Sequence, residues 1–233
     1  LAKGKYASSN LGTLTREVLK SRRFGFADFK PYAPSGGKPA AFIAEPVLHD
    51  GDMQLVVALQ LPQSRINAMV QEGADKERTL ESYLVGPDHI MRSDSIINAD
   101  YTVDNSFAKN LTVKTEAVEK ALSHEEGHKI ITDYNGEKVL SAFGPVDIFG
   151  TTYALMSEID KKVAFGAVRD MMNLSILVAV VTIVGVLAFA IALTRSIANP
   201  IKMVIQGLTS GSEQVTAASG QLSSASQSLS ESS

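Results

Sequence analysis

The sequence predicts an α+β fold: an antiparallel five-stranded sheet with flanking helices, followed by one transmembrane helix and a cytoplasmic coiled-coil-type helix. Three observations predict this order. Before residue 160, apolar runs of strand length alternate with turns that contain Gly, Asp or Asn. An uncharged apolar segment, residues 174–193, follows. The chain then ends in a Ser-rich segment, residues 207–233, that carries a heptad pattern of apolar and small residues.

The first elements follow from local pattern. Apolar residues at helical spacing predict a helix over 11–22. Residues 40–48 and 53–61 are apolar runs joined by His49-Asp50-Gly51-Asp52, which predicts two strands and a tight turn. A short helix is expected from Pro62 to near Gly73.

The next elements follow the same logic. Residues 81–85 and 89–93 flank Gly86-Pro87-Asp88 and predict a short strand pair, and residues 113–122 form one helical face. Residues 129–134 and 137–143 flank Asn135-Gly136, which predicts a hairpin with a type I′ turn. A last strand over 151–158 is expected to lead, from Ile159, into a helix that continues unbroken into the membrane.

The overall composition excludes several classes of protein. With 45% apolar and 20% charged residues, the chain is not wholly disordered. A net charge of −3 argues against a nucleic-acid binder. The chain has no cysteine, which excludes disulfides and Cys-based metal sites. It begins at Leu1 without a signal peptide, so we interpret it as a piece of a longer protein.

Residues 174–193 are long enough to cross a membrane, because 20 helical residues span about 30 Å. A buried core helix is the alternative, but such a helix would normally show a polar stripe. Basic residues flank the segment on both sides in similar number, so the positive-inside rule does not fix its orientation.

Seven residues on or beside the central strands and the long excursion between them could form a ligand pocket. An Arg can clamp a carboxylate, an Asp can accept from an ammonium group, and aromatic rings can exclude water. The alternative is that they form ordinary surface ion pairs and core tyrosines. They are Tyr83, Arg92, Asp94, Tyr101, Asp104, Phe107 and Asp133.

His124-Glu-Glu-Gly-His128 fits the H-E-x-x-H pattern of zinc hydrolases, in which two His one helical turn apart bind the metal. Gly127 disfavours a helix through the motif, and Lys129 begins a predicted strand. We therefore expect a solvated turn, no metal, no cofactor and no catalytic residue. A membrane-anchored zinc hydrolase that uses His124, Glu125 and His128 stays as the alternative.

Several segments together resemble bacterial methyl-accepting chemotaxis receptors with a Cache-type, PAS-like extracytoplasmic sensor domain. The resemblance covers about residues 24–160 and continues through the membrane helix. The segments are Phe29-Lys-Pro-Tyr-Ala-Pro-Ser35, Pro39-Ala-Ala-Phe-Ile-Ala-Glu-Pro46, Leu59-Gln-Leu-Pro62, Ser82-Tyr-Leu-Val-Gly-Pro-Asp88, Met91-Arg-Ser-Asp94, Asp133-Tyr-Asn-Gly136, Val139-Leu-Ser-Ala142 and Tyr153-Ala-Leu-Met-Ser-Glu-Ile-Asp160.

After the membrane segment, Arg195-Ser-Ile-Ala-Asn-Pro-Ile201 resembles the entry of a HAMP signal-relay module, but the second acidic helix start of that module does not follow. Residues 207–219 resemble the start of a methyl-accepting signalling helix. A seam spaced 4-3-4-3 independently indicates a weak coiled coil, and a disordered Ser-rich tail is the alternative. The expected relay residues are Pro200, Leu208, Val215, Leu222 and Leu229.

The resemblance implies a homodimer in the bacterial inner membrane, with residues 1–170 extracytoplasmic and 195–233 cytoplasmic. A small ligand (amino acid, organic acid or amine) would bind between the sheet and the excursion at 92–125. The signal would reach a histidine kinase and coupling protein through a part C-terminal to this chain, although a kinase or cyclase output is an alternative. A distal module before Leu1 could instead bind the ligand, leaving residues 24–160 to transmit.

The expected organisation has five parts. They are residues 1–23, an N-terminal helix remnant; 24–160, the sensor domain; 161–194, the juxtamembrane and transmembrane helix, with membrane lipid as a partner; 195–206, a HAMP-like entry; and 207–233, the start of a signalling helix.

Overall fold

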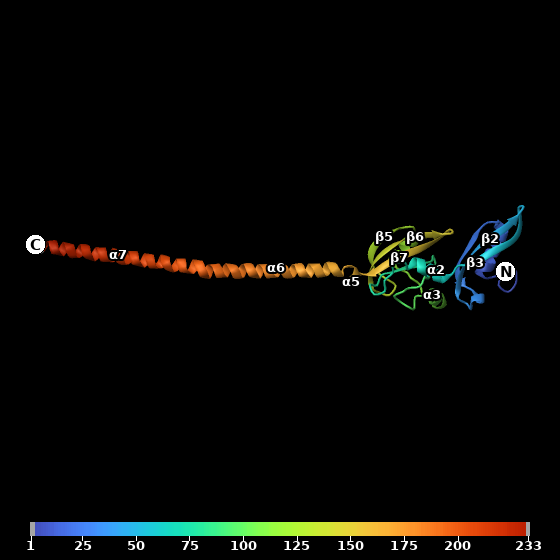
Figure 1. Ribbon diagram of the computed structural model, residues 1–233, viewed down its shortest axis with the longest axis horizontal. Coiled ribbons are helices and arrows are strands. Elements are labelled where there is room, and N and C mark those ends of the chain that lie inside the picture. Colours follow the sequence, from blue (N-terminus) through green and yellow to red (C-terminus); the bar gives the residue numbers. More distant parts are fainter. Residues whose placement is uncertain (1–2, 232–233) are drawn as a thin grey trace. The chain divides into compact units, whose positions relative to one another are not determined.

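Seven strands in the described part of the chain, residues 3–231, form two separate antiparallel sheets. Figure 1 shows the computed structural model. The chain divides into two compact units: Leu1–Ala167, which contains both sheets, and Val168–Ser233, which is helical.

The first sheet contains, in order, β1 (Gly25–Pro31), β2 (Pro39–His49) and β3 (Asp52–Gln60). Helix α1 (Asn10–Ser21) covers one face of this sheet. Its apolar residues recur at helical spacing, so they lie on the one side of the helix that packs against the strands. Leu14, Val18 and Phe42 are buried at this interface. The amide of Asn10 also donates to the carbonyls of Asp28 and Ala40, at 3.0 and 2.7 Å, which fixes the helix on the strands.

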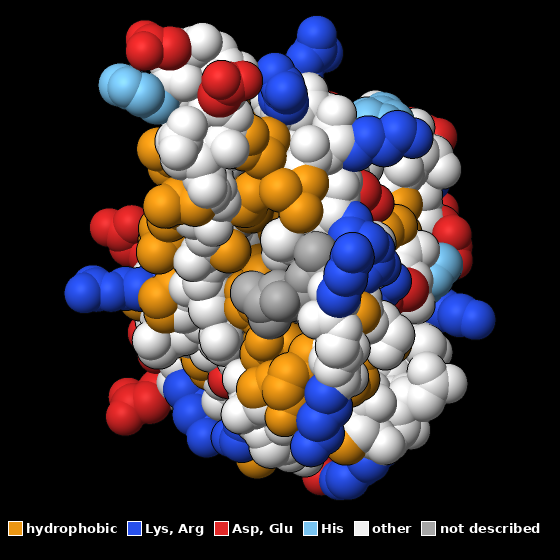
Figure 2. Space-filling model, turned by 90° about the vertical axis from the view of Figure 1, so that its right-hand side faces the viewer, with side chains coloured by type: hydrophobic (Ala, Val, Ile, Leu, Met, Phe, Trp, Pro, Cys, Tyr) orange, Lys and Arg blue, Asp and Glu red, His pale blue; other side chains and the backbone are white. Residues whose placement is uncertain are grey.

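The opposite face of this sheet carries exposed apolar side chains. Val47, Leu55, Val57 and Leu59 are all exposed. Figure 2 shows hydrophobic side chains gathered on the molecule as seen from the β2–β3 end, with charged residues around them.

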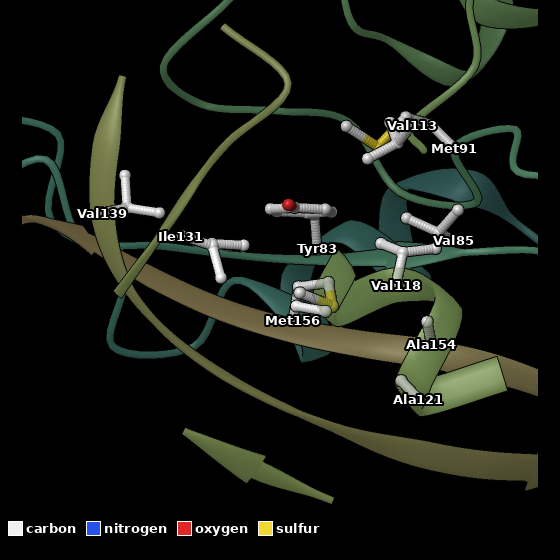
Figure 3. Close-up of a cluster of buried hydrophobic side chains, with 11 residues drawn as sticks. Tyr83, Val85, Met91, Val113, Val118, Ala121, Ile131, Val139, Ala154 and Met156 are labelled. Atoms are coloured by element: carbon white, nitrogen blue, oxygen red, sulfur yellow. The ribbon is translucent and has the colours of Figure 1, made fainter. Parts of the chain in front are cut away.

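The second sheet has the order β4-β7-β6-β5, built from β4 (Glu81–Val85), β5 (Gly127–Thr132), β6 (Lys138–Ile148) and β7 (Thr151–Asp160). Helix α4 (Glu116–Leu122) covers one face and contributes Val118 to a buried cluster. Tyr83 and Met156 lie directly opposite each other on β4 and β7 and are fully buried in that cluster (Figure 3). This face of the second sheet therefore forms the largest core of the unit.

Helix α2 (Gln63–Val70) leads from the first sheet to the second, and helix α3 (Val103–Lys109) lies in the excursion between β4 and β5. The Asp94 carboxylate ties them together, because it accepts hydrogen bonds from Gln63 at 2.9 Å, from Asn67 at 2.7 Å and from the Val103 amide at 2.7 Å.

The α+β class with antiparallel strands is confirmed, but the expected single five-stranded sheet is not found. The strands are instead divided into a three-stranded and a four-stranded sheet. Strand β1 and helix α3 were not expected. Conversely, residues 89–93 form no strand of their own and pair only through isolated bridges at Ile90 and Met91.

The predicted type I′ turn at Asn135-Gly136 is wrong. Only Gly136 has a positive φ, of 85°, and its amide donates to the Asp133 carbonyl at 3.2 Å. This is the three-residue hairpin loop with Gly in the left-handed position. The type I′ pattern occurs instead at Asp50-Gly51 and at Phe149-Gly150, where both residues have positive φ.

Strand β7 continues to Asp160 and is followed by the short helix α5 (Lys161–Ala164). Phe165 separates α5 from α6 (Gly166–Leu193), so the expected unbroken helix from Ile159 is wrong. Helix α6 and its continuation form the one helix, among the described residues, that is long and apolar enough to cross a membrane.

A π-helical turn, Thr194–Ala198, separates α6 from α7 (Asn199–Glu231). Pro200 lies directly after this turn, where its missing N–H removes one helical hydrogen bond. The Ser-rich segment is therefore helical rather than disordered over its described residues.

Candidate functional site

A cavity of about 290 Å³ opens between the second sheet, the β5–β6 turn and the loop at residues 97–99. Five of its lining residues are acidic, and none is Lys or Arg. The acidic residues come from three elements: Glu81 from β4, Asp133 and Glu137 from the β5–β6 turn, and Glu158 and Asp160 from β7.

The register of the sheet places the two most buried carboxylates together. Glu81 on β4 lies directly opposite Glu158 on β7, so both side chains leave the same face of the sheet. Their exposures are 3% and 2%. Two like charges in directly opposed positions repel each other, and neither residue forms a salt bridge in the described part of the chain.

Hydroxyl groups hold the two carboxylates in place of a cation. Glu158 accepts from the Tyr83 hydroxyl at 2.9 Å and from the Ser141 hydroxyl at 2.8 Å. Burial dominates over these hydrogen bonds and raises the pKa of Glu158 to about 7. Glu81 accepts from Ser95 at 2.8 Å and from Tyr134. With a pKa of about 7, Glu158 is partly protonated at neutral pH, which lowers the repulsion between the two groups.

Tyrosine rings adjoin these carboxylates. The Tyr134 ring lies 4.5 Å from Tyr101 and 5.3 Å from Tyr83, measured between centroids. Burial raises the pKa of Tyr83 and of Tyr134 well above the ordinary value, so both phenols stay protonated donors. The tyrosines thus position the carboxylates, and the cavity presents acidic residues without a basic one in its lining, which suits a positively charged group.

Three of the predicted site residues, Tyr83, Tyr101 and Asp133, lie at or next to this cavity. Asp133 lines it directly and also orders the β5–β6 turn, since its carboxylate accepts from the amides of Asn135 at 2.9 Å and Glu137 at 2.8 Å. Tyr83 lies beneath it, bonded to Glu158.

Arg92 lies away from the acidic cavity. Its guanidinium is 2% exposed and donates to Asp28 on β1 at 2.7 Å and to Asp88 at 2.9 Å. Gly86 makes room for it, because a Cβ there would lie 2.4 Å from the guanidinium carbon. Arg92 therefore joins the two sheets and has no free donor fork for a ligand carboxylate.

The other predicted residues have structural partners. Asp94 holds α2 and α3, as described above. Asp104 pairs with Lys38 at 2.9 Å on the surface. The Phe107 ring lies 5.1 Å from the Arg92 guanidinium. Of the set of seven, three thus lie at or next to the acidic cavity, and four lie elsewhere in the unit.

Glu81 and Glu158 were missed as candidate residues. A signal was present in the sequence, because each is an acidic residue in a strand that otherwise consists mostly of uncharged residues. The fact that they face each other depends on a pairing between residues 77 positions apart, which no local pattern shows.

The H-E-x-x-H motif does not form a helical metal site. Helix α4 ends at Leu122, and His124 has a positive φ of 62°. His128 belongs to strand β5, so the two rings do not share a helix face. Among the described residues, no group of three or more His, Asp or Glu side chains is arranged so that it could hold a metal ion.

No family model matches the sequence, and no curated protein matches it. Solved structures do match. The periplasmic sensory domain of the Campylobacter jejuni chemoreceptor Tlp1 is 14% identical with a TM-score of 0.50, covering 68% of this chain and 57% of that one. The ligand-binding domain of the Pseudomonas aeruginosa PAO1 amino acid chemoreceptor PctB, in complex with L-Arg, is 14% identical with a TM-score of 0.46, covering 71% and 64%.

The chain spans less than two thirds of the length of each of these two structures. The likeness to the Tlp1 domain shows that the chain has the fold of a chemoreceptor sensory domain, which confirms the fold expected from the resemblance.

Proposed function

We propose that the chain is the sensor and membrane-spanning part of a chemoreceptor that binds a small molecule outside the cytoplasm. One observation supports this most directly. Strand β7 carries Glu158 and Asp160 of the acidic cavity, and α5 and then the apolar helix α6 follow within six residues of Asp160. A ligand that binds these carboxylates acts on the strand that precedes the membrane helix.

The ligand class follows from charge. An organic acid would meet five acidic residues without a basic partner in the cavity, whereas an ammonium group would gain favourable contacts with Glu81 and Glu158. We therefore propose an amine, or a ligand that presents its ammonium group to this cavity.

We propose the organisation expected from the sequence for the sensor domain, the membrane span and the cytoplasmic helix. The sensor domain spans 24–160, the membrane span 174–193 lies in the inner membrane among lipid, and residues 195–233 begin the cytoplasmic signalling helix of a homodimer. Pro200 and the heptad seam would pass the change to a histidine kinase and coupling protein. A ligand can shift this equilibrium only by binding its two states with different affinity.

Binding tests the proposal. We expect calorimetry on the full chain in lipid nanodiscs at pH 8 to detect butylammonium or 1,4-diaminobutane and not butanoate. Glu158→Gln should weaken amine binding at least tenfold, because it removes a charge-assisted contact of roughly 1.5–3 kcal/mol. Affinity should also fall from pH 8 to pH 6, as Glu158 takes up a proton near pH 7.

The matched control is Glu72→Gln, the same exchange at an exposed carboxylate after α2, which should leave affinity unchanged. Equal binding of butanoate, or an unchanged affinity in Glu158→Gln, would contradict the assignment of this cavity.

A further inference from the structure

A second cavity, of about 400 Å³, lies within the unit Leu1–Ala167 between the two sheets and helix α2. Its walls are mainly apolar: Phe26 and Phe29 from β1, Leu84 from β4, Val146 from β6, Leu155 from β7 and Met69 from α2.

This cavity and the acidic cavity lie on opposite faces of the second sheet. Leu84 and Leu155 face each other in the β4–β7 register, one position away from Tyr83 and Met156. Since alternate residues of a strand point to opposite faces, the leucines leave the face that α4 does not cover. The two cavities are therefore separate sites.

The few polar side chains of the apolar cavity are already engaged within the protein. Ser82 and Ser157 bond to each other at 3.1 Å. The Tyr153 hydroxyl bonds to Asp28, which, together with burial, raises the pKa of the phenol. Arg92 donates to Asp28, to Asp88 and to the Ile90 carbonyl. The positive charge in the wall is thus balanced by two carboxylates.

An ion that entered this cavity would lose its water without finding a free counter-charge, which is costly. An uncharged apolar molecule has no charge to desolvate. Its burial against the aromatic and aliphatic walls would therefore be favourable. We propose that this cavity binds a small, neutral, apolar molecule, aromatic or short-chain aliphatic, at the junction of the two sheets.

The position gives such a ligand a structural effect. Phe149, at the turn between β6 and β7, lies 4.9 Å from Phe24 and 5.4 Å from Phe26 between ring centroids. A molecule in contact with both β1 and β7 would add apolar contacts between the two sheets. These contacts would stabilise the arrangement of the sheets within the unit.

Methionine-methyl NMR on the full chain in lipid nanodiscs tests the proposal with toluene as the probe. Met69 lies at the cavity and is 77% exposed, while Met53 on β3 does not line it. We expect a saturable shift of the Met69 signal and no saturable shift of Met53. Benzoate and benzylammonium, of similar size but charged, should leave Met69 unshifted.

Two variants, Leu155→Trp and Val146→Trp, each place a larger side chain in the cavity. If one of them misfolds, the other still provides the test. Each should raise the dissociation constant of toluene at least tenfold. Leu59→Trp, the same type of exchange at an exposed leucine outside this cavity, should change it less than twofold.

Three results would overturn the proposal. Met69 could stay unshifted, or it could shift without saturation together with Met53, which indicates partition into lipid. It could also shift with protein concentration in the absence of toluene, which would show that a second copy of the chain covers this face. None of these results bears on amine binding in the acidic cavity.

Discussion

Glu158 carries the clearest pH dependence at the scale of single residues. Burial raises its pKa to about 7, above the ordinary value of 4.5, so the folded state holds a proton that the unfolded state releases. The stability of the fold must then decrease as pH rises from about 4.5 through 7, by on the order of 3 kcal/mol. Above pH 7 this decrease is complete.

Urea unfolding of the chain across pH 5 to 8 measures this effect. We expect Glu158→Gln to remove most of the slope, because Gln keeps the hydrogen-bond acceptor without a titrating proton. Glu72→Gln, at an exposed site, should keep the slope of the unchanged chain. Identical slopes in Glu158→Gln and the unchanged chain would show that Glu158 titrates near its ordinary value.

Arg92 is the second residue whose removal has a definite expected result. Arg92→Ala leaves Asp28 with an unpaired charge at the junction of the sheets, and should lower the free energy of unfolding by about 3–5 kcal/mol. Lys38→Ala breaks an exposed pair with Asp104 and should cost less than about 1 kcal/mol. Similar losses for the two variants in urea unfolding would mean that Arg92 is not a structural anchor.

At the scale of elements, helix α7 presents its heptad seam to solvent. Leu208, Val215 and Leu222 are all exposed, and the side chain of Leu229 lies outside the described residues. A homodimer would bury this seam. The chain has no cysteine, so single cysteines report contacts directly. We expect cysteines at 208, 215 and 222 to form intermolecular disulfides several-fold faster than cysteines at 209, 216 and 223.

The same helix offers a control for that comparison. Thr209 and Thr216 bond to carbonyls one turn earlier on their own helix, so cysteine replacement there removes a bond within one helix. Equal cross-linking rates on and off the seam would argue against the expected coiled coil.

Elements formed by neighbouring residues could be predicted from the sequence, and those formed by distant pairing could not. The hairpin of β2 and β3 and the strands β5, β6 and β7 follow from apolar runs and turn residues. The division into two sheets depends on β4 pairing with β7 across the excursion. The alignment of Glu81 with Glu158 has the same origin, whereas Asp133 stands beside a turn that the sequence predicts, so it could be named as a candidate.

At the scale of the whole molecule, the proposed coupling between the acidic cavity and the membrane helix would depend on a short connection. Between Asp160 of the acidic cavity and helix α6 lie only α5 and Phe165, whose amide donates to the Lys161 carbonyl at 3.1 Å. If β7 passes its change of state along this connection, two glycines inserted after Phe165 should interrupt it, because glycine adds backbone freedom.

A single cysteine at Met172 in α6 provides the measurement, as the disulfide cross-linking rate between two chains in nanodiscs. In the unchanged connection, a saturating amine should alter this rate, and Glu158→Gln should abolish the response because the amine no longer binds. With the two glycines inserted, amine affinity measured by calorimetry should stay within twofold while the cross-linking rate no longer responds. A response that survives the insertion would show that the signal reaches the membrane helix by a route other than β7.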